Sequence, residues 1–284
     1  MNGILVIDKD QNMTSFDVIN KIKKSLKIKK IGHAGTLDPL ATGVLVVLLN
    51  EATKLSNYLL NDEKEYLCEI VVGHSTTTED IEGEILEKKD VEKLENVDEV
   101  LNSLVGDLLQ VPPMYSAVHY QGKKLYELAR KGEVVEREAR NVKIYAINRV
   151  SDIVYENNIA SFSFQTTVSK GTYLRTLCVE IGKRLGYPAH MKALRRLRSG
   201  ALTIASAYSL HDVLDGKFQL ISMLEALNKY HIIEVDKATA GDILNGKKIK
   251  INANDDLIVL SYQNNLLAIY ERDNDYYRAK RIWN

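Results

Sequence analysis

The chain has 284 residues, of which 45% are hydrophobic and 27% charged, and its 38 basic and 38 acidic side chains give a net charge of zero. This is the composition of a globular protein that can bury a substantial core, and its length predicts one large domain with a smaller one. No apolar run reaches the roughly 18 residues of a membrane-spanning helix, and the N-terminus lacks the basic start of a signal peptide, so we expect a cytoplasmic protein.

The cysteines and histidines form no pattern typical of a metal site. Cys68 and Cys178 lie far apart in apolar segments, which favours buried free thiols over a disulfide. The six histidines are scattered and the chain has no C-x-x-C pair. A Walker A loop and a G-x-G-x-x-G motif are also missing. We therefore expect neither a bound metal nor a nucleotide cofactor.

The first fifth of the chain predicts a helix, a loop and a buried strand. Thr14-Ser15 offers an N-cap, and apolar residues at helical spacing follow up to Leu26, so we expect an amphipathic helix with lysines on its outer face. Residues 32–43 form a loop because they contain three glycines and a proline. One carboxylate, Asp38, stands in its middle. The continuous apolar run 44–49 predicts a strand buried on both faces.

The rest of the first 200 residues predicts alternating strands and helices. Alternation and turn residues indicate strands, while a 3.6-residue apolar period indicates helices. Strands are expected at 64–72, 143–154, 159–168 and 194–200, with a hairpin turn at 156–158, and helices at about 55–59, 91–104 and 174–185. Gly186 and Pro188 end the last helix.

A segment at about 108–140 differs from its surroundings. Basic residues and tyrosines interleave there after Pro112-Pro113. Such a segment can wrap a nucleic acid, with cations on phosphates and aromatic rings on bases. The same composition also fits an ordinary surface hairpin and helix.

Two basic clusters stand out against the zero net charge. One contains the lysines between Lys21 and Lys30, and the other runs from Lys192 to Arg198. A basic run is more often a solvated helix face than a binding site. Because both clusters flank the candidate chemistry, we expect contacts with phosphate groups.

The last 55 residues predict a separate β-rich unit. A short helix at 239–244, an Asn245-Gly246 turn and strands near 257–262, 266–272 and 276–283 follow each other closely. We expect a domain boundary near 229, which gives domains at 1–228 and 229–284.

Several motifs, taken together, resemble the TruB family, the bacterial tRNA pseudouridine-55 synthases. The strongest is G-H-x-G-T-L-D-P-L-A-T-G-V-L, which spans residues 32–45 without a break. The supporting motifs are Lys64-x-Tyr66, Val111-Pro112-Pro113-x-Tyr115-Ser116-Ala117, Leu125-Tyr126-x-x-Ala129-Arg130-x-Gly132, Ser169-Lys170-Gly171-Thr172-Tyr173-x-Arg175 and Leu194-Arg195-Arg196. The resemblance covers nearly the whole chain.

The resemblance implies a mixed α/β (α+β) fold, the pseudouridine synthase fold, with a bent, mainly antiparallel sheet flanked by helices and a small PUA-like C-terminal domain. It implies an isomerase that converts the T-loop uridine at tRNA position 55 to pseudouridine, without a cofactor. The glycosidic bond moves from N1 to C5 of uracil. The expected partner is the T arm of tRNA, and the expected enzyme is a monomer without an obligatory protein partner or membrane contact.

The resemblance also assigns four catalytic residues. Asp38 matches the family aspartate, and a carboxylate can serve this reaction as nucleophile or as acid–base group. Arg175 matches the arginine that pairs with it. Tyr66 matches the tyrosine that stacks on the target base, and Tyr173 matches a second tyrosine of the site. Without the motifs, Tyr66 would be interpreted as a core residue and Asp38 as a turn former.

Further residues are expected to bind the substrate. The target uridine must flip out of the folded T arm, at a cost of about a few kcal/mol. His33 matches the histidine that helps fill the vacated space, and Leu194 matches an apolar residue that packs on the base. The other expected contacts, mostly with the RNA backbone, are Lys9, Tyr115, Lys123, Arg130, Arg195 and Arg196.

The chain departs from the family where Lys-Pro-x-Gly is usual, because it has Lys9-Asp10-Gln11-Asn12. Asparagine tolerates a left-handed φ, so we expect this turn to persist.

Two other functions remain open. One is a guide-RNA-dependent pseudouridine synthase, like the archaeal and eukaryotic relatives; the type of the 108–140 segment and the short C-terminus favour a stand-alone enzyme. The other is an RNA-binding or tRNA-folding protein with incidental catalysis, which the intact catalytic set disfavours. A glycosidase is weakly supported, since no second acid accompanies Asp38.

Overall fold

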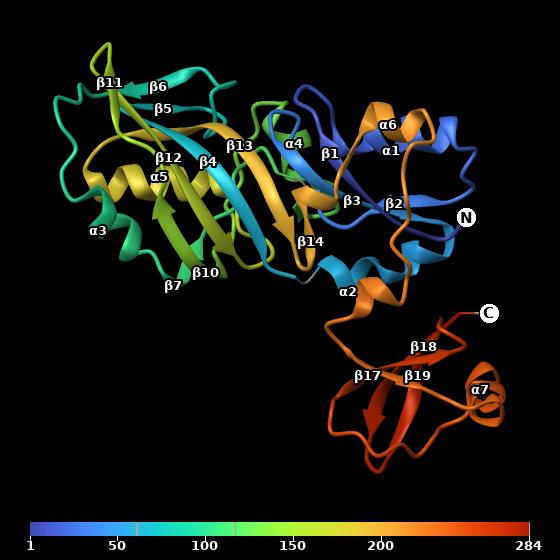
Figure 1. The fold of residues 1–284 in the computed structure, drawn as a ribbon. Helices are drawn as coiled ribbons and strands as arrows, with labels where there is room; N and C mark the ends of the chain where they lie inside the picture. Colours follow the sequence, from blue (N-terminus) through green and yellow to red (C-terminus); the bar gives the residue numbers. More distant parts are fainter. Residues whose placement is uncertain (61, 117, 284) are drawn as a thin grey trace.

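The computed structural model describes residues 1–60, 62–116 and 118–283. Its described part contains one long twisted sheet with helices packed on it and a smaller C-terminal sheet (Figure 1). The main path of the long sheet runs in the order β15 (Tyr208–Ser209), β1 (Gly3–Lys9), β3 (Thr42–Leu49), β13 (Ala189–Ser199), β4 (Lys64–Val72), β12 (Ile159–Val168), β10 (Arg140–Arg149) and β7 (Gly106–Gln110). Three short strands pair beside it, namely β2 (Ile31–His33), β11 (Val154–Glu156) and β14 (Leu202–Thr203).

The long sheet consists of two halves joined by one parallel pairing. Most neighbouring strands are antiparallel, but β3 and β13 run parallel, with Thr42 opposite Arg195 and Gly43 opposite Arg196. In Figure 1, β1 and β3 belong to the half on the right, and β4, β12, β10 and β7 belong to the half on the left. The predicted mixed α/β class with a mainly antiparallel sheet is confirmed.

The strand at 44–49 is buried on both faces, as its sequence predicts. Alternate side chains of β3 enter two different cores: Leu45 and Val47 pack in one, and Val44 and Val46 in the other. This alternation follows from the two-residue period of a strand.

Helices pack against the face of the sheet that carries the first core, the one that contains Leu45 and Val47. α1 (Ser15–Ser25) begins with a capping box between Thr14 and Asp17, which confirms the predicted N-cap. It ends earlier than the lysine run, so Lys27 lies beyond the helix with a φ of 51°. α5 (Leu174–Leu185) ends at Gly186 with a φ of 82°, as predicted. The remaining helices of this domain are α2 (Ser56–Leu60), α3 (Val97–Asn102), α4 (Leu125–Ala129), α6 (Leu210–Leu214) and the 3-10 turns Asn50–Leu55, Ile204–Ser206 and Glu225–Leu227.

The predicted helix at 91–104 is wrong over its first half. Only α3 is helical there, because the preceding amides bond to a neighbouring hairpin. The Val91 N–H donates to the Asn158 carbonyl, and the Leu94 N–H donates to the Tyr155 hydroxyl. These amides therefore cannot enter a helical ladder.

Two predicted strands have different bounds. The strand expected at 143–154 is divided, since β10 ends at Arg149 and β11 begins at Val154. The Ser151 hydroxyl accepts the Ser163 N–H and bends the chain between them. The strand expected at 194–200 begins earlier, at Ala189, and pairs with β4 along its length.

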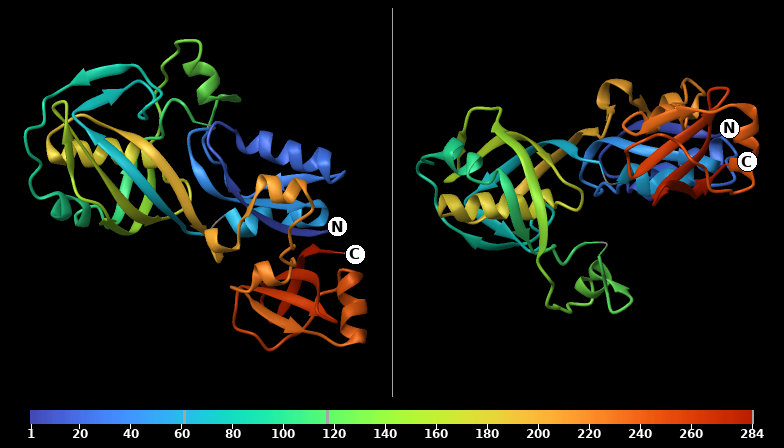
Figure 2. Two further views of the ribbon diagram at one scale, coloured as in Figure 1. Left: turned by 45° about the horizontal axis from the view of Figure 1, so that its top comes forward. Right: turned by 90° about the horizontal axis from the view of Figure 1, so that it is seen from below.

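The segment between β7 and β10 is an insertion that stands away from the sheet. It contains β8 (His119–Tyr120) paired with β9 (Lys123–Lys124), followed by α4. Both views of Figure 2 show α4 projecting beyond the two halves of the sheet. A second small hairpin, β5 (His74–Thr76) with β6 (Ile85–Lys88), lies near the far end of the left half in Figure 1.

The C-terminal unit is a small sheet, as expected for the β-rich end of the chain. Its strands β16 (His231–Glu234), β17 (Leu257–Tyr262), β18 (Asn265–Asp273) and β19 (Tyr276–Ile282) pair in sequence order, beside α7 (Lys237–Leu244). Val259 and Trp283 share the second core with Val44 and Val46 of β3. The Trp283 indole also donates to the Glu51 carbonyl at 3.3 Å. The C-terminal sheet is therefore packed on the large domain.

None of the described helices is both long and apolar enough to cross a membrane.

Candidate active site

A cavity of about 640 Å³ lies where the two halves of the long sheet meet. Four of its walls come from distant parts of the chain: the loop before β3, the strands β4 and β13, and the turn before α5. Its lining includes five residues that the sequence singles out, namely Asp38, Tyr66, Tyr173, Leu194 and Arg196.

The loop that carries Asp38 is held through its backbone on both sides of the aspartate. The buried Ser15 hydroxyl accepts the Leu37 N–H at 2.9 Å and lies 3.2 Å from the Leu37 carbonyl. On the other side, the Pro39 carbonyl accepts the Asn12 N–H at 3.0 Å. Asn12 has a φ of 62°, so the expected left-handed turn is present. Asp38 therefore sits on a loop fixed by the first strand and the first helix.

Lys9 is part of this support. Its side chain is 1% exposed, and its ammonium lies 3.3 Å from the Pro39 carbonyl and 2.7 Å from the Met13 carbonyl. Burial lowers the pKa of Lys9 to about 8. The structure thus places Lys9 beneath the loop, and its predicted contact with the substrate stays a prediction.

Arg196 holds the start of the same loop. It is 1% exposed, and its Nε donates to the Val44 carbonyl at 2.6 Å while Nη2 donates to the Gly35 carbonyl at 3.0 Å. Gly43 lies against it with a φ of 96°, and a Cβ at this glycine would stand 2.2 Å from the Arg196 carbonyl. The glycine is thus required for the β3–β13 pairing.

Arg175 connects Asp38 to the interior. Its side chain is 6% exposed, whereas that of Asp38 is 42% exposed, and Nη2 lies 3.0 Å from the Asp38 carboxylate. Nη2 also donates to the Tyr115 carbonyl and Nη1 to the Thr78 carbonyl, at 2.9 and 3.1 Å. A buried arginine fixed by carbonyls thus orients a carboxylate that still reaches the cavity.

A second carboxylate, Asp80, lies on the other side of Arg175. Its Oδ2 is 3.6 Å from Nη1, and its side chain is 9% exposed. The Thr78 hydroxyl donates to Asp80 at 2.5 Å, which fixes the carboxylate. No role for Asp80 was predicted from the sequence.

Two aromatic rings and a leucine complete the cavity. Tyr66 lies on β4 directly opposite Arg196 of β13, and Leu194 lies two residues earlier on the same strand. Tyr173 precedes α5. Burial raises the pKa of the Tyr173 phenol above 10, and the charge of Asp38 acts in the same direction. The phenol is therefore neutral at pH 7 and can donate or accept a hydrogen bond.

Lys64 is a cavity residue that sequence reasoning left without a role, although its Lys64-x-Tyr66 motif was noted. Its ammonium donates to the Leu60 and Asp62 carbonyls at 3.1 and 2.9 Å. Burial lowers its pKa to about 8, and the nearby Arg196 adds to this effect. A cation with this pKa adds positive charge to the cavity at neutral pH.

The other expected substrate-binding residues lie outside the cavity. His33 is on β2, where its Nδ1 is buried without a partner among the described residues, and burial lowers its pKa. Arg195 forms a two-point ion pair with Asp8 at 3.0 and 2.7 Å. Lys123 and Arg130 are exposed on the insertion. Their predicted contacts with RNA stay predictions.

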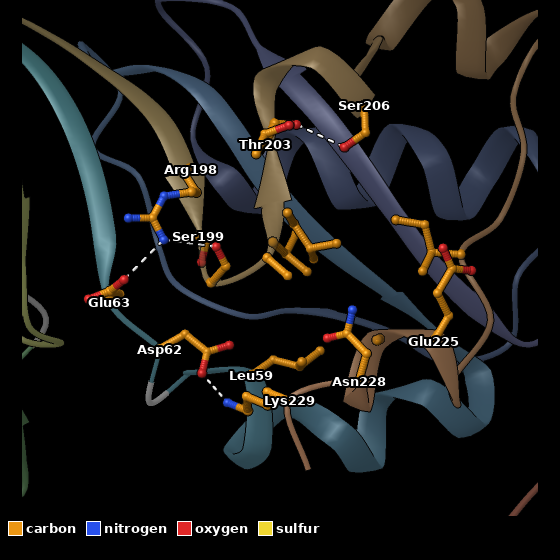
Figure 3. A pocket seen from close by; sticks show the side chains of 16 residues that line it. Leu59, Asp62, Glu63, Arg198, Ser199, Thr203, Ser206, Glu225, Asn228 and Lys229 are labelled. Atoms are coloured by element: carbon orange, nitrogen blue, oxygen red, sulfur yellow. Dashed lines mark hydrogen bonds and ion pairs between the residues drawn. The ribbon is translucent and has the colours of Figure 1, made fainter. Parts of the chain in front are cut away.

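A second cavity of about 430 Å³ lies between the large domain and residues 221–229 (Figure 3). The charged side chains at its rim pair with each other, Asp62 with Lys229 and Arg198 with Glu63. None of the catalytic residues expected from the sequence lines this second cavity. Among the residues that the structure describes, no three His, Cys, Asp or Glu side chains gather as a metal site would require.

Comparisons with known proteins identify the family and the fold. Residues 23–174 match the family model described as TruB family pseudouridylate synthase (N terminal domain), and residues 175–237 match the tRNA pseudouridylate synthase B C-terminal domain. The chain superposes on a chain of an H/ACA ribonucleoprotein bound to a substrate RNA containing 2′-deoxyuridine, with a TM-score of 0.73, 23% identity and coverage of 99% and 85% of the two chains. The chain has the fold of a pseudouridine synthase.

Full-length relatives define the family. The tRNA pseudouridine synthase B of Staphylococcus saprophyticus is 42% identical over 305 residues, which cover 100% of this chain and 99% of the relative. That of Clostridium tetani is 42% identical over 277 residues, which cover 96% and 93%. The chain belongs to the TruB family of tRNA pseudouridine synthases, which are isomerases.

Proposed function

We propose that this enzyme converts the T-loop uridine at tRNA position 55 to pseudouridine. The observation that carries the proposal is the ion pair between Asp38 and the buried Arg175 at a cavity lined by Tyr66, Tyr173 and Leu194. The cavity volume of about 640 Å³ accommodates a flipped nucleotide. The T arm is the substrate that the motif resemblance implies, and the name of the relatives, tRNA pseudouridine synthase B, supports tRNA as the substrate.

The reaction breaks one bond and forms another within the same nucleotide. The C1′–N1 bond breaks and a C1′–C5 bond forms, so C5 loses a proton and N1 gains one. Asp38 serves this migration as nucleophile or as acid–base group, and Arg175 holds its carboxylate in place. No other atoms are exchanged with a second substrate.

The walls of the cavity receive the base after flipping. Tyr66 stacks on the uracil, Leu194 packs against it, and the neutral phenol of Tyr173 hydrogen-bonds within the site. His33 helps to occupy the space that the base leaves in the T loop. Packing and stacking of this kind offset the cost of unstacking the uridine, which is about a few kcal/mol.

The enzyme acts alone, as a monomer. Residues 1–228 form the catalytic domain and 229–284 form a PUA-like domain. The insertion at 108–140 holds the RNA through Lys123 and Arg130, and recognition is mainly of RNA shape. Purified protein should therefore modify an unmodified T-arm stem-loop without a guide RNA or a second protein; a strict requirement for either would favour the guided alternative.

The proposal is tested by the release of tritium from C5-labelled uridine in such a stem-loop. Asp38→Asn should abolish release while the affinity for the RNA changes little, because the substitution removes only the reactive carboxylate. Asp98→Asn is the matched control, since Asp98 pairs with Arg149 at the surface and should leave release unchanged. Substantial turnover by Asp38→Asn would remove Asp38 from the chemistry.

A further inference from the structure

The insertion begins at Gln110, whose side chain hydrogen-bonds to the backbone of Tyr173. Gln110 ends β7 and is 4% exposed. Its Nε2 donates to the Tyr173 carbonyl at 3.0 Å, and its Oε1 accepts the Tyr173 N–H at 2.7 Å. One buried carboxamide thus satisfies both backbone polar groups of a single residue, which fixes that residue in position and orientation.

These two hydrogen bonds lie at the start of α5. Tyr173 is the N-cap residue, with φ −95° and ψ 114°, and no side chain caps the helix there. Its carbonyl also accepts the first helical hydrogen bond, from the Leu177 N–H at 3.0 Å. Gln110 therefore sets the direction in which the helix leaves the cavity, and with it the position of Arg175 two residues later.

The residues after Gln110 touch the same pair of catalytic side chains. The Tyr115 carbonyl accepts Nη2 of Arg175 at 2.9 Å. Ser116 lines the same cavity as Tyr173, and its buried hydroxyl has no hydrogen-bond partner among the described residues. The Tyr126 N–H of α4 donates to the Ser116 carbonyl at 3.0 Å. The base of the insertion, residues 110–116, thus contacts both Tyr173 and Arg175.

We propose that Gln110 is a positioning residue for the isomerisation, which acts by holding Tyr173 and Arg175 against Asp38. The proposal rests on the proposed function of these three residues. The RNA-binding cations of the insertion, Lys123 and Arg130, lie beyond Gln110 in the chain. Loss of the carboxamide should therefore slow the chemical step and leave RNA affinity nearly unchanged.

Two substitutions at Gln110 distinguish the loss of both hydrogen bonds from the loss of one. Gln110→Met keeps the length of the side chain and removes both bonds, while Gln110→Glu keeps the shape and the acceptor but loses the donor when it is ionised. We expect the single-turnover rate on a T-arm stem-loop to fall about 100-fold for Gln110→Met, since displacements of about 1 Å cost this much, and less for Gln110→Glu. The dissociation constant of the RNA should change less than about threefold.

The pH profile gives a readout that a purely structural role would not move. A protonated carboxyl group again offers one donor and one acceptor, as the carboxamide does. The rate of Gln110→Glu, divided by the wild-type rate at each pH, should therefore rise as the pH falls from 8 to 5.5. Gln165→Met, which removes a carboxamide bonded to Glu65 on the same sheet, is the control and should keep the wild-type rate.

Each outcome decides the proposal. A wild-type rate for Gln110→Met, or a loss that appears only in RNA affinity, would overturn it. If Gln110→Met does not fold, as judged by its thermal unfolding, the normalised pH profile of Gln110→Glu decides: a rise at low pH supports the positioning role and a flat profile contradicts it. Failure of the proposed function would show separately, as wild-type enzyme without activity on the stem-loop.

Discussion

The two basic clusters, at residues 21–30 and 192–198, look alike in the sequence but differ in the structure in whether their charged groups have partners within the protein. The lysines between Lys21 and Lys30 are all exposed, and none forms a side-chain ion pair or hydrogen bond among the described residues. The four cations from Lys192 to Arg198 all have bonding partners within the protein, although only Arg196 is buried. Their partners are Glu69 for Lys192, Asp8 for Arg195, backbone carbonyls for Arg196, and Glu63 and Glu65 for Arg198.

The difference comes from the elements that carry the clusters. The helical lysines project from the outer face of α1, which leaves them in water. The second cluster lies on β13, a central strand with neighbours on both sides, so its cations meet β4 and the Asp38 loop. A run of charged residues therefore indicates a binding surface only when one face of the helix or strand that carries it is exposed to solvent. Two experiments test this contrast, and a third, between them in size, tests a buried lysine outside both clusters; they are ordered from the largest to the smallest expected effect on folding energy.

The largest effect is expected at Arg196. Arg196→Met leaves buried carbonyls of Gly35 and Val44 without their donor, and each unsatisfied group costs about 1–3 kcal/mol. We expect the free energy of unfolding in urea to fall by about 3 kcal/mol and the tritium-release rate to fall with it. Arg195→Gln is the control, since the pair with Asp8 is half-exposed and is worth at most about 1 kcal/mol. If Arg196→Met is as stable as wild type but binds RNA poorly, the arginine belongs to the RNA surface.

Much of the active site could be predicted because its residues stand in short motifs. The loop at 32–43 could be recognised from its glycines and its proline, and the strand at 44–49 from its unbroken apolar run. Tyr66, Tyr173 and Leu194 were expected in the site from the matched motifs, and they line one cavity with Asp38. Local pattern and motif were sufficient in these places.

The supports of the site could not be predicted, because they are long-range bonds between side chains and backbone. Ser15 is read as part of a helix start, and only the folded chain brings its hydroxyl to Leu37, 22 residues later. Gln110 meets Tyr173 across 63 residues. Lys9 was expected to contact the substrate, and nothing in its neighbourhood in the sequence shows that it is buried. The half-wrong helix at 91–104 has the same cause, since its first amides bond to a distant hairpin.

An intermediate effect is expected from the buried lysines. Lys9 has a pKa of about 8 in the folded protein against 10.5 for the ordinary side chain. Between these values the unfolded chain binds more protons than the folded one, so stability rises with pH in that window and is lost as the pH falls through 8. For Lys9 the rise from pH 8 to 9.5 is about 1.5 kcal/mol.

Urea unfolding at the two pH values measures this contribution. Wild type should gain stability from pH 8 to 9.5, and Lys9→Met should gain about 1.5 kcal/mol less than wild type. Lys24→Met is the control, because Lys24 is exposed on α1 and should leave the pH dependence unchanged. Equal pH dependence of all three proteins would show that Lys9 is not held in a low-dielectric site.

The smallest effect on folding, and the largest on RNA binding, is expected at the exposed cluster. A triple variant, Lys23→Gln with Lys24→Gln and Lys27→Gln, removes three exposed charges that form no side-chain ion pair or hydrogen bond within the described residues. Its thermal unfolding should match wild type. If these lysines contact phosphates, RNA affinity at about 0.1 M salt should fall at least about tenfold. The slope of log affinity against log salt should decrease by about one for each lysine.

A second triple variant separates a local contact from net charge. Lys192→Gln with Lys217→Gln and Lys247→Gln removes the same total charge, but these lysines pair with Glu69, Asp215 and Asp242. Because those pairs already neutralise them, the salt slope should stay close to that of wild type. Equal losses of RNA affinity in the two triple variants would mean that RNA binding depends on the net charge of the whole protein. A loss confined to the first triple would place the RNA backbone along α1 and the turn that follows it.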